Sequence, residues 1–278
     1  MENYSVLMSV YHKEKPEYLR DSIQSMLDQT TRTNDFVLVC DGPLTPELDA
    51  VISDFNNRNA ELFQIVRLEK NMGIGCAANE GLEHCKNDLV AKMDSDDISR
   101  SDRCEKQLIA FAADPTLHIV GSHIIEFMDD LNNEISRRIV PLEHADIVKY
   151  ARRRMPFNNQ TVMYRKHKVM EAGGYSLLRR CEDYDLYVRM LSNNCLARNI
   201  DDYLVWYRLT DNAFERRGTW EQLKGFTQVR WKMYRQGFSG PFDFFLPCCA
   251  QLMITLAPYK LKRYFYTRIL RQNQRKAQ

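Results

Sequence analysis

Short apolar segments alternate with helical patterns through the first hundred residues of the chain. Four segments have the composition of buried strands: residues 4–11, 35–40, 63–68 and 89–93. Between the first two, apolar residues recur at helical spacing, namely Leu19, Ile23, Met26 and Leu27. Strands that alternate with helices favour a largely parallel sheet covered on both faces, with ligands at the carboxyl ends of the strands. The sequence therefore predicts an α/β fold whose site lies just after its strands.

Polar turns follow three of these strands. Residues 41–42 (DG) follow the second strand, residues 71–75 (NMGIG) the third, and residues 94–97 (DSDD) the fourth. Because the carboxyl ends of parallel strands lie at one edge of a sheet, we expect the three turns to converge there.

The turn after the fourth strand places Asp94, Asp96 and Asp97 within four residues. Hard carboxylate oxygens suit Mg²⁺ or Mn²⁺, and an ion held by one or two of them keeps positions for substrate phosphates. Asp residues also occur at helix N-termini, where they accept hydrogen bonds from free backbone N–H groups. Three carboxylates exceed what such a cap requires, so we interpret the cluster as a site for a metal-bound diphosphate.

The second half of the chain has a mixed pattern. A helix is predicted near residues 145–152, a strand over 161–165, a turn at Gly173-Gly174 and a strong helix over 183–191. A length of 278 residues favours one α/β domain with a C-terminal appendage.

The C-terminal segment differs in character. Residues 242–258 carry one charge, Asp243, and residues from Lys260 onward combine Lys, Arg and aromatic side chains with no acid. A transmembrane helix needs about 20 apolar residues, which this proline-interrupted segment lacks. Two interpretations remain: an amphipathic stretch in the membrane interface, or a helical hairpin packed on the domain.

Composition excludes several classes of protein. Hydrophobic residues at 44% and charged residues at 27% are typical of a globular chain. Eight cysteines without C-x-x-C spacing indicate reduced thiols in a cytosolic protein, and the N-terminus lacks the pattern of a secretory signal. The basic residues form no stripe over the predicted sheet, so we expect no nucleic-acid partner.

Five motifs in order resemble a family 2 glycosyltransferase of the GT-A fold, of the bacterial surface-polysaccharide kind. They are MSVYHKE, VCDGP, EKNMGIGCAANEGL, AKMDSDDIS with DRCEKQ behind it, and CEDYDLYVRM. The resemblance runs from about residue 4 to residue 218. It implies a GT-A glycosyltransferase domain over residues 1–218, with a nucleotide-sugar half over about 1–100 and an acceptor half over about 101–218. The composition of the segment beyond it predicts a helical, membrane-associating extension over residues 219–278.

The resemblance implies a set of residues that bind the nucleotide sugar: Ser9, Tyr11, Glu14, Asp41, Asn71, Gly73, Asp94, Arg208, Arg216 and Arg217. In such enzymes the acid after the second strand accepts a hydrogen bond from the base, the glycine-containing loop lies near base and ribose, and the arginines contact phosphates. From the residues alone, Asp41 and the 71–75 loop are equally explained as ordinary turns.

The same resemblance implies the chemistry. Asp96 ligates Mn²⁺ or Mg²⁺ on the diphosphate, Asp97 supports the loop, and Asp183, beside Glu182, is the base that deprotonates the acceptor of an inverting transfer. From the residues alone, Asp183 is explained as an acidic side chain stabilised by the positive end of a helix dipole.

Two segments depart from the family pattern. Relatives often carry a histidine two positions after the arginine at 208, where this chain has Thr210, so we expect Asp96 and the diphosphate to hold the ion without a histidine. Relatives often show His-Pro where this chain has Asn159-Gln160, which leaves the acceptor open.

We therefore expect an inverting enzyme that moves a hexose, galactose or glucose in β linkage, from a UDP-sugar to a polyprenyl-diphosphate-linked N-acetylhexosamine. It would act in O-antigen or capsule synthesis, peripherally on the cytoplasmic face of the cell membrane. Two alternatives stay open: a sugar nucleotidyltransferase, although MSVYHKEKPEY lacks the glycine-rich loop that holds a triphosphate, and an inactive scaffold of the same fold.

Overall fold

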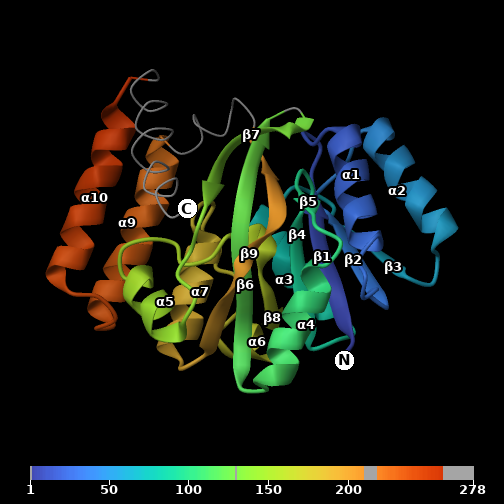
Figure 1. Ribbon diagram of the computed structural model, residues 1–278. Helices are drawn as coiled ribbons and strands as arrows, with labels where there is room; N and C mark the ends of the chain where they lie inside the picture. The colour runs from blue at the N-terminus through green and yellow to red at the C-terminus, as the bar shows by residue number, and fades with distance from the viewer. Residues whose placement is uncertain (1, 129, 210–217, 259–278) are drawn as a thin grey trace.

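The computed structural model describes residues 2–128, 130–209 and 218–258 (Figure 1). Its first half alternates strands and helices: β1 (Tyr4–Val10), α1 (Pro16–Leu27), β2 (Asp35–Cys40), α2 (Pro46–Arg58), β3 (Phe63–Arg67), α3 (Ile74–His84) and β4 (Leu89–Asp94). The four strands expected from the sequence are thus confirmed to within one residue at each end. Pro46 begins α2, and the Thr45 side chain caps it by accepting a hydrogen bond from the Leu48 backbone N–H.

The second half adds β5 (Ile98–Ser99), α4 (Arg103–Ala113), β6 (Leu117–Met128), β7 (Asp130–Arg138), α5 (His144–Ala151), the 3₁₀ turn η1 (Asn159–Thr161), β8 (Met163–Arg165), α6 (Lys166–Glu171), α7 (Glu182–Ser192) and β9 (Leu196–Arg208). The helices expected near 145–152 and 183–191 correspond to α5 and α7. Two further helices follow, α9 (Trp220–Arg235) and α10 (Pro241–Leu256).

The strands form one mixed sheet in the order β3-β2-β1-β4-β8-β6-β9-β5, with β7 paired to β6. The strands β3, β2, β1 and β4 are all parallel. The chain leaves β1 toward β2 and β3 and later returns to the other side of β1 as β4, so the strand order reverses between β1 and β4. Such a switch point opens a crevice at the carboxyl ends of the strands.

Helices cover both faces of the sheet and form two cores (Figure 1). Val6 and Met8 of β1 pack with α1, α2 and α4, whereas Leu7 faces the opposite core with α3, α5 and α7. The alternation in β1 is the period of two expected of a strand buried on both faces. The buried side chains of α1 include the predicted Leu19, Ile23 and Met26.

The helices α9 and α10 pack against each other at one side of the molecule, and α9 also packs on α7 (Figure 1). A small apolar cluster joins the two, formed by Tyr184 and Val188 of α7 with Val229 and Met233 of α9. Within the described residues, no helix combines the length and hydrophobicity needed to cross a membrane. All eight cysteines are free, and Cys40, Cys85, Cys104 and Cys195 are buried.

Candidate active site

The turns after β1 and β4 are held together at the switch point. Ser9 stands beside Asp94 in the register of the two parallel strands. Glu14, in the turn after β1, accepts a hydrogen bond of 2.8 Å from the Ser95 hydroxyl through its Oε2, and Ser22 of α1 donates to the Asp94 carbonyl over 2.7 Å. Tyr11 follows β1 and is 36% exposed. The structure therefore brings four residues predicted to bind the donor, Ser9, Tyr11, Glu14 and Asp94, to one edge of the sheet.

Asp41 organises the loop after β3. Its Oδ1 accepts a hydrogen bond of 2.6 Å from the Met72 backbone N–H, and its Oδ2 accepts one of 3.1 Å from Gly73. The Asn71 side chain returns a bond of 3.2 Å to the Asp41 carbonyl. Gly42 has φ of 87°, and a Cβ there would lie 2.6 Å from the Asn71 nitrogen, so only glycine fits. Asp41, Asn71 and Gly73 meet as expected, and the contact of Asp41 with a base stays a prediction.

A buried lysine that was not predicted from the sequence contacts the acidic loop, residues 94–97. Lys92 of β4 is only 2% exposed, and its Nζ lies 2.8 Å from Asp94 Oδ1. Its position could have been inferred, because Lys92 is the only charged residue in the apolar segment 89–93 and a buried charge requires a partner of opposite charge. Arg103 of α4, fully buried, donates to the Lys92 carbonyl over 2.7 Å and ties the end of β4 to α4.

Asp97 is the most buried carboxylate of the loop. Its Oδ1 accepts a hydrogen bond of 2.8 Å from the Arg208 backbone N–H, while its Oδ2 has no hydrogen-bond partner among the described residues. Burial, and then the negative charges of Asp96 and Asp94, raise the pKa of Asp97 well above its usual range. A divalent cation on this loop would offset that excess of negative charge.

The donor set fits a cation that is shared with a substrate. No group of three or more His, Cys, Asp or Glu side chains in the described parts of the chain is arranged to hold an ion. An ion at Asp96 would therefore complete its coordination with diphosphate oxygens and water, as Mg²⁺ and Mn²⁺ sites with few protein carboxylates do.

Arg208 ends β9 and is 5% exposed. Its Nε donates to the Asp96 carbonyl over 2.9 Å, and its Nη2 lies 3.2 Å from Asp21 of α1. The guanidinium stacks 4.0 Å from the ring centroid of Tyr18 and 4.8 Å from that of Phe127. The predicted phosphate ligand is therefore occupied by protein groups that hold the acidic loop against α1 and β9.

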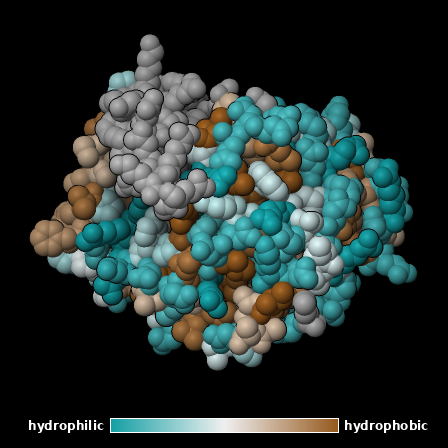
Figure 2. Space-filling model, viewed as in Figure 1, coloured by the Kyte–Doolittle hydropathy of each residue, from teal (hydrophilic) through white to brown (hydrophobic). Residues whose placement is uncertain are grey.

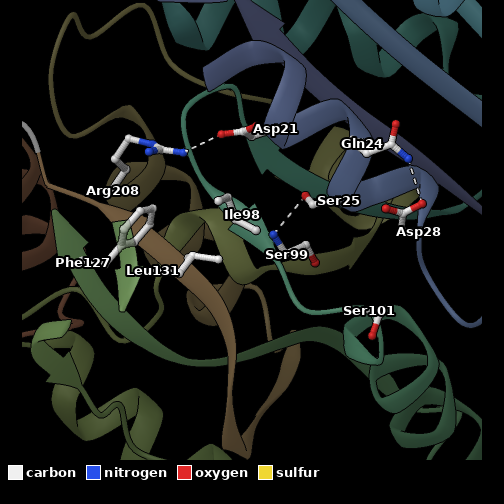
Figure 3. Close-up of a pocket in the computed structure, with 10 residues that line it drawn as sticks. All are labelled: Asp21, Gln24, Ser25, Asp28, Ile98, Ser99, Ser101, Phe127, Leu131 and Arg208. Carbon is white, nitrogen blue, oxygen red and sulfur yellow. Dashed lines mark hydrogen bonds and ion pairs between the residues drawn. The ribbon is translucent and has the colours of Figure 1, made fainter. Parts of the chain in front are cut away.

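The same guanidinium borders a cavity of about 460 Å³ beside the acidic loop, between α1, β5 and the adjoining ends of β6 and β7 (Figure 3). Figure 3 shows Arg208 pointing toward Asp21, and the Ser99 backbone N–H donating to the Ser25 hydroxyl across the space. The residues that line this cavity do not include Asp94, Asp96 or Asp183.

Glu182 and Asp183 begin α7, as the sequence predicts. Burial raises the pKa of Asp183, which the Tyr184 N–H and the positive charge of Lys92 partly offset. Burial and the neighbouring Asp183 likewise raise the pKa of Glu182, and Lys92 again opposes the shift. Lys92 thus contacts Asp94 and lies near enough to both acids of α7 to favour their charged forms. The positive charge of Arg138 of β7, a residue not predicted from the sequence, also lowers the pKa of Asp183.

The other predicted positions are the loop at residues 159–160 and three residues of the segment that follows β9. Asn159 of η1, at one of the two departures from the family pattern, accepts a hydrogen bond of 2.9 Å from the Tyr187 hydroxyl of α7, and Gln160 is 5% exposed. This fixes the loop assigned to the acceptor against the helix that carries Asp183. Thr210, Arg216 and Arg217 lie outside the described residues.

Comparison with known proteins identifies the family. The model of the family described as glycosyl transferase family 2 matches residues 5–185, well over half of the chain. The chain belongs to glycosyl transferase family 2. The resemblance seen in its motifs is thereby confirmed.

Two curated proteins are similar to this family 2 member over nearly its whole length. The amylovoran biosynthesis glycosyltransferase AmsE of Erwinia amylovora is 36% identical over 95% of this chain and 97% of its own. The UDP-Gal:alpha-D-GlcNAc-diphosphoundecaprenol beta-1,3-galactosyltransferase of Escherichia coli is 32% identical over 97% of each chain. The first name assigns that relative to amylovoran biosynthesis, and the second describes a galactosyltransferase that acts on a diphosphoundecaprenol-linked GlcNAc.

Solved structures confirm the GT-A-like fold of this family 2 member. The mannosyltransferase PcManGT of Pyrobaculum calidifontis, in complex with GDP-Man and Mn²⁺, superposes with a TM-score of 0.66 at 15% identity, over 94% of this chain and 72% of that one. TarS of S. aureus, in complex with UDP-GlcNAc, gives 0.64 at 17% identity over 95% and 73%. In another structure with a longer TarS chain, the match covers 44% of that chain.

Proposed function

We propose that the protein is an inverting hexosyltransferase that moves galactose from UDP-galactose, in β linkage, to an N-acetylhexosamine carried on a polyprenyl diphosphate. Glucose is the second donor to test. Membership of glycosyl transferase family 2 supports glycosyl transfer over nucleotidyl transfer. The choice of donor and acceptor follows the Escherichia coli relative, whose name contains both UDP-Gal and a GlcNAc-diphosphoundecaprenol.

The observation that carries the proposal is the pairing of two acidic groups across the switch point. Asp94 ends β4 and Asp96 follows it, Asp183 lies in the first turn of α7, and Lys92 lies close enough to influence both sides. The acidic loop, with a divalent cation, suits a nucleotide diphosphate, and Asp183 suits the role of proton acceptor. These are the two requirements of an inverting displacement. Ser9, Tyr11, Glu14, Asp41, Asn71 and Gly73 would line the nucleotide pocket, and Arg216 and Arg217 would contact the phosphates.

In the proposed mechanism, Asp183 removes the proton of the acceptor hydroxyl while its oxygen attacks the anomeric carbon. The bond from that carbon to the diphosphate breaks on the opposite face, so UDP leaves and the configuration inverts. A raised pKa improves Asp183 as a base, because proton affinity rises with pKa. Asp96 would hold Mn²⁺ or Mg²⁺, which when bound stabilises the charge of the leaving diphosphate.

We propose that the exposed face of α10 binds the membrane that carries the lipid acceptor. Large apolar side chains on this helix face solvent, among them Phe242 at 82%, Phe245 at 61%, Leu246 at 63% and Met253 at 66% exposed. Figure 2 shows hydrophobic residues along the side of the molecule where α10 lies. The sequence continues into the basic, aromatic residues 260–278. Apolar and cationic groups together suit an anionic membrane surface, so we propose peripheral binding at the cytoplasmic face.

The decisive test is UDP release from a panel of UDP-sugars, with and without Mn²⁺, using a synthetic GlcNAc-diphosphate-lipid acceptor. We expect acceptor-dependent and metal-dependent turnover with UDP-galactose, and a loss of about 10²- to 10⁴-fold in Asp183→Asn, because a general base contributes that much. Binding of UDP without turnover on any acceptor would favour the scaffold alternative. Absence of nucleotide binding would overturn the proposal.

A further inference from the structure

We propose that α9, in the C-terminal extension, is a positioning element for the acceptor-side base, and that Gln222 and Gly225 are its contact residues. The inference rests on the proposed role of Asp183. It assigns a function in the reaction to a helix beyond residues 5–185, the part matched by the family model. The contacts fall on the residues immediately before and after the acid pair.

The first contact is between backbones. Gly225 lies in the middle of α9, and a Cβ at this position would stand 2.6 Å from the carbonyl oxygen of Arg180. Such an approach is closer than side-chain carbons tolerate, so only glycine allows α9 to lie directly against the turn that enters α7. A glycine inside a helix costs about 1 kcal/mol relative to alanine. The close approach of α9 to Arg180 explains why a glycine stands at this helical position.

The second contact holds a strained residue. Cys181, the N-cap of α7, has φ of 64° in the left-handed region, which non-glycine residues rarely adopt. Its Sγ accepts a hydrogen bond of 3.1 Å from the Gln222 side chain. Backbone strain of this kind persists only where surrounding contacts fix it, and it occurs next to functional groups. The strained residue directly precedes Glu182 and Asp183, so its conformation sets the direction in which α7 and the acid pair begin.

The other side of the acid pair is also held by α9. Arg230 is fully buried, with its guanidinium 5.2 Å from the ring centroid of Tyr184 and 4.8 Å from that of Phe226. It donates to the carbonyls of Arg152, at the end of α5, and Asp243, in the first turn of α10. Tyr184 follows Asp183 directly. The acid pair is thus bracketed by contacts to α9 on both sides, and α10 is joined to the same assembly.

Two variants separate positioning from folding. Gly225→Ala places a methyl group against Arg180, and Gln222→Ala removes only the bond to Cys181. The matched control is Gln228→Ala, the same substitution at an exposed position of the same helix. Each variant is measured in the full-length protein for kcat and donor KM in the galactosyltransferase assay, for UDP affinity with Mn²⁺, and for melting temperature.

We expect kcat to fall about tenfold in Gln222→Ala and about 10²-fold in Gly225→Ala, because misplacing a reacting group by about 1 Å has that effect. Donor KM and UDP affinity should stay within twofold of wild type, since Gln222 and Gly225 lie against Cys181 and Arg180, which are not among the residues assigned to the donor. Gln228→Ala should match wild type throughout. A merely structural role would lower UDP affinity and melting temperature together, and that result would overturn the inference. Wild-type kcat in both variants would overturn it as well.

The failure of this inference is distinguishable from failure of the proposed function. Turnover by the wild-type protein that disappears in Asp183→Asn upholds the proposed function, whatever the α9 variants do. If the wild-type protein does not turn over, the proposed function fails first, and the inference falls with it.

Discussion

At the scale of single residues, the site depends on a lysine that compensates carboxylates on two sides. Lys92 is buried, pairs with Asp94 at 2.8 Å and opposes the upward pKa shift of Asp183. A positive charge beside buried carboxylates favours their ionised forms. Removing it therefore affects the donor side and the base together.

Replacing Lys92 with methionine keeps the volume and deletes the charge. We expect kcat to fall about 10²-fold, the usual cost of removing one preorganised charge or donor from an active site. Asp183 must be ionised to act as a base, and burial already raises its pKa. Loss of the positive charge raises it further, so the acid limb of the kcat–pH profile should move to higher pH.

The control for this variant is Lys86→Met, which removes a 56% exposed lysine that lies 3.8 Å from Asp35. Its rate and pH profile should match those of the wild-type protein. An acid limb that stays in place, or moves to lower pH, in Lys92→Met would contradict the electrostatic role assigned to Lys92.

At the scale of elements, the acidic loop is held by an arginine from β9, the strand that pairs with β5. Arg208 ends β9 and contacts the Asp96 carbonyl, Asp21 of α1 and two aromatic rings. The conformation of the loop therefore depends on β9 as well as on β4. This dependence can be measured as stability.

We expect Arg208→Lys to lower the free energy of unfolding by about 1–3 kcal/mol, because lysine keeps the charge but leaves buried acceptors without the planar fork that satisfies them. The matched change is Arg20→Lys in α1, where the arginine is half exposed and lies 3.4 Å from Asp54. That variant should change stability by less than about 0.5 kcal/mol. Urea denaturation compares the two, and equal effects would show that Arg208 does not support the loop.

Local patterns explain which elements could be predicted from the sequence. The strands β1 to β4 and the positions of Asp41, Asp94 and Asp183 follow from periodicity and from motifs, both of which are contained in short segments. The role of Arg208 could not be predicted, because it depends on the pairing of β9 with β5 and β6, segments about a hundred residues earlier. Lys92 was predictable in principle, since a lone cation in an apolar strand requires a buried partner.

At the scale of the whole molecule, the apolar face of α10 is the surface through which we expect the protein to reach its lipid acceptor. The double variant Phe245→Ser/Leu246→Ser should reduce binding to vesicles containing anionic phospholipid by on the order of 10²-fold, since each large apolar side chain contributes about 1.5–3 kcal/mol when fully buried. Cosedimentation measures the partitioning. Turnover of a water-soluble acceptor analogue should be unchanged.

The control is Ile109→Ser, which removes an exposed apolar side chain from α4, away from the α9–α10 pair. Vesicle binding by this variant should equal that of the wild-type protein. Equal binding by all the variants would show that α10 does not contact the membrane.

The contact of Gly225 with Arg180 also limits how such enzymes exchange parts. A chimaera that took residues 219–278 from a relative would bring a helix shaped for a different turn before the acid pair. Unless residues 180–185 came from the same relative, the hybrid would bind its nucleotide and transfer sugar slowly. We therefore expect that the two segments, about 40 residues apart in sequence, can be exchanged only together.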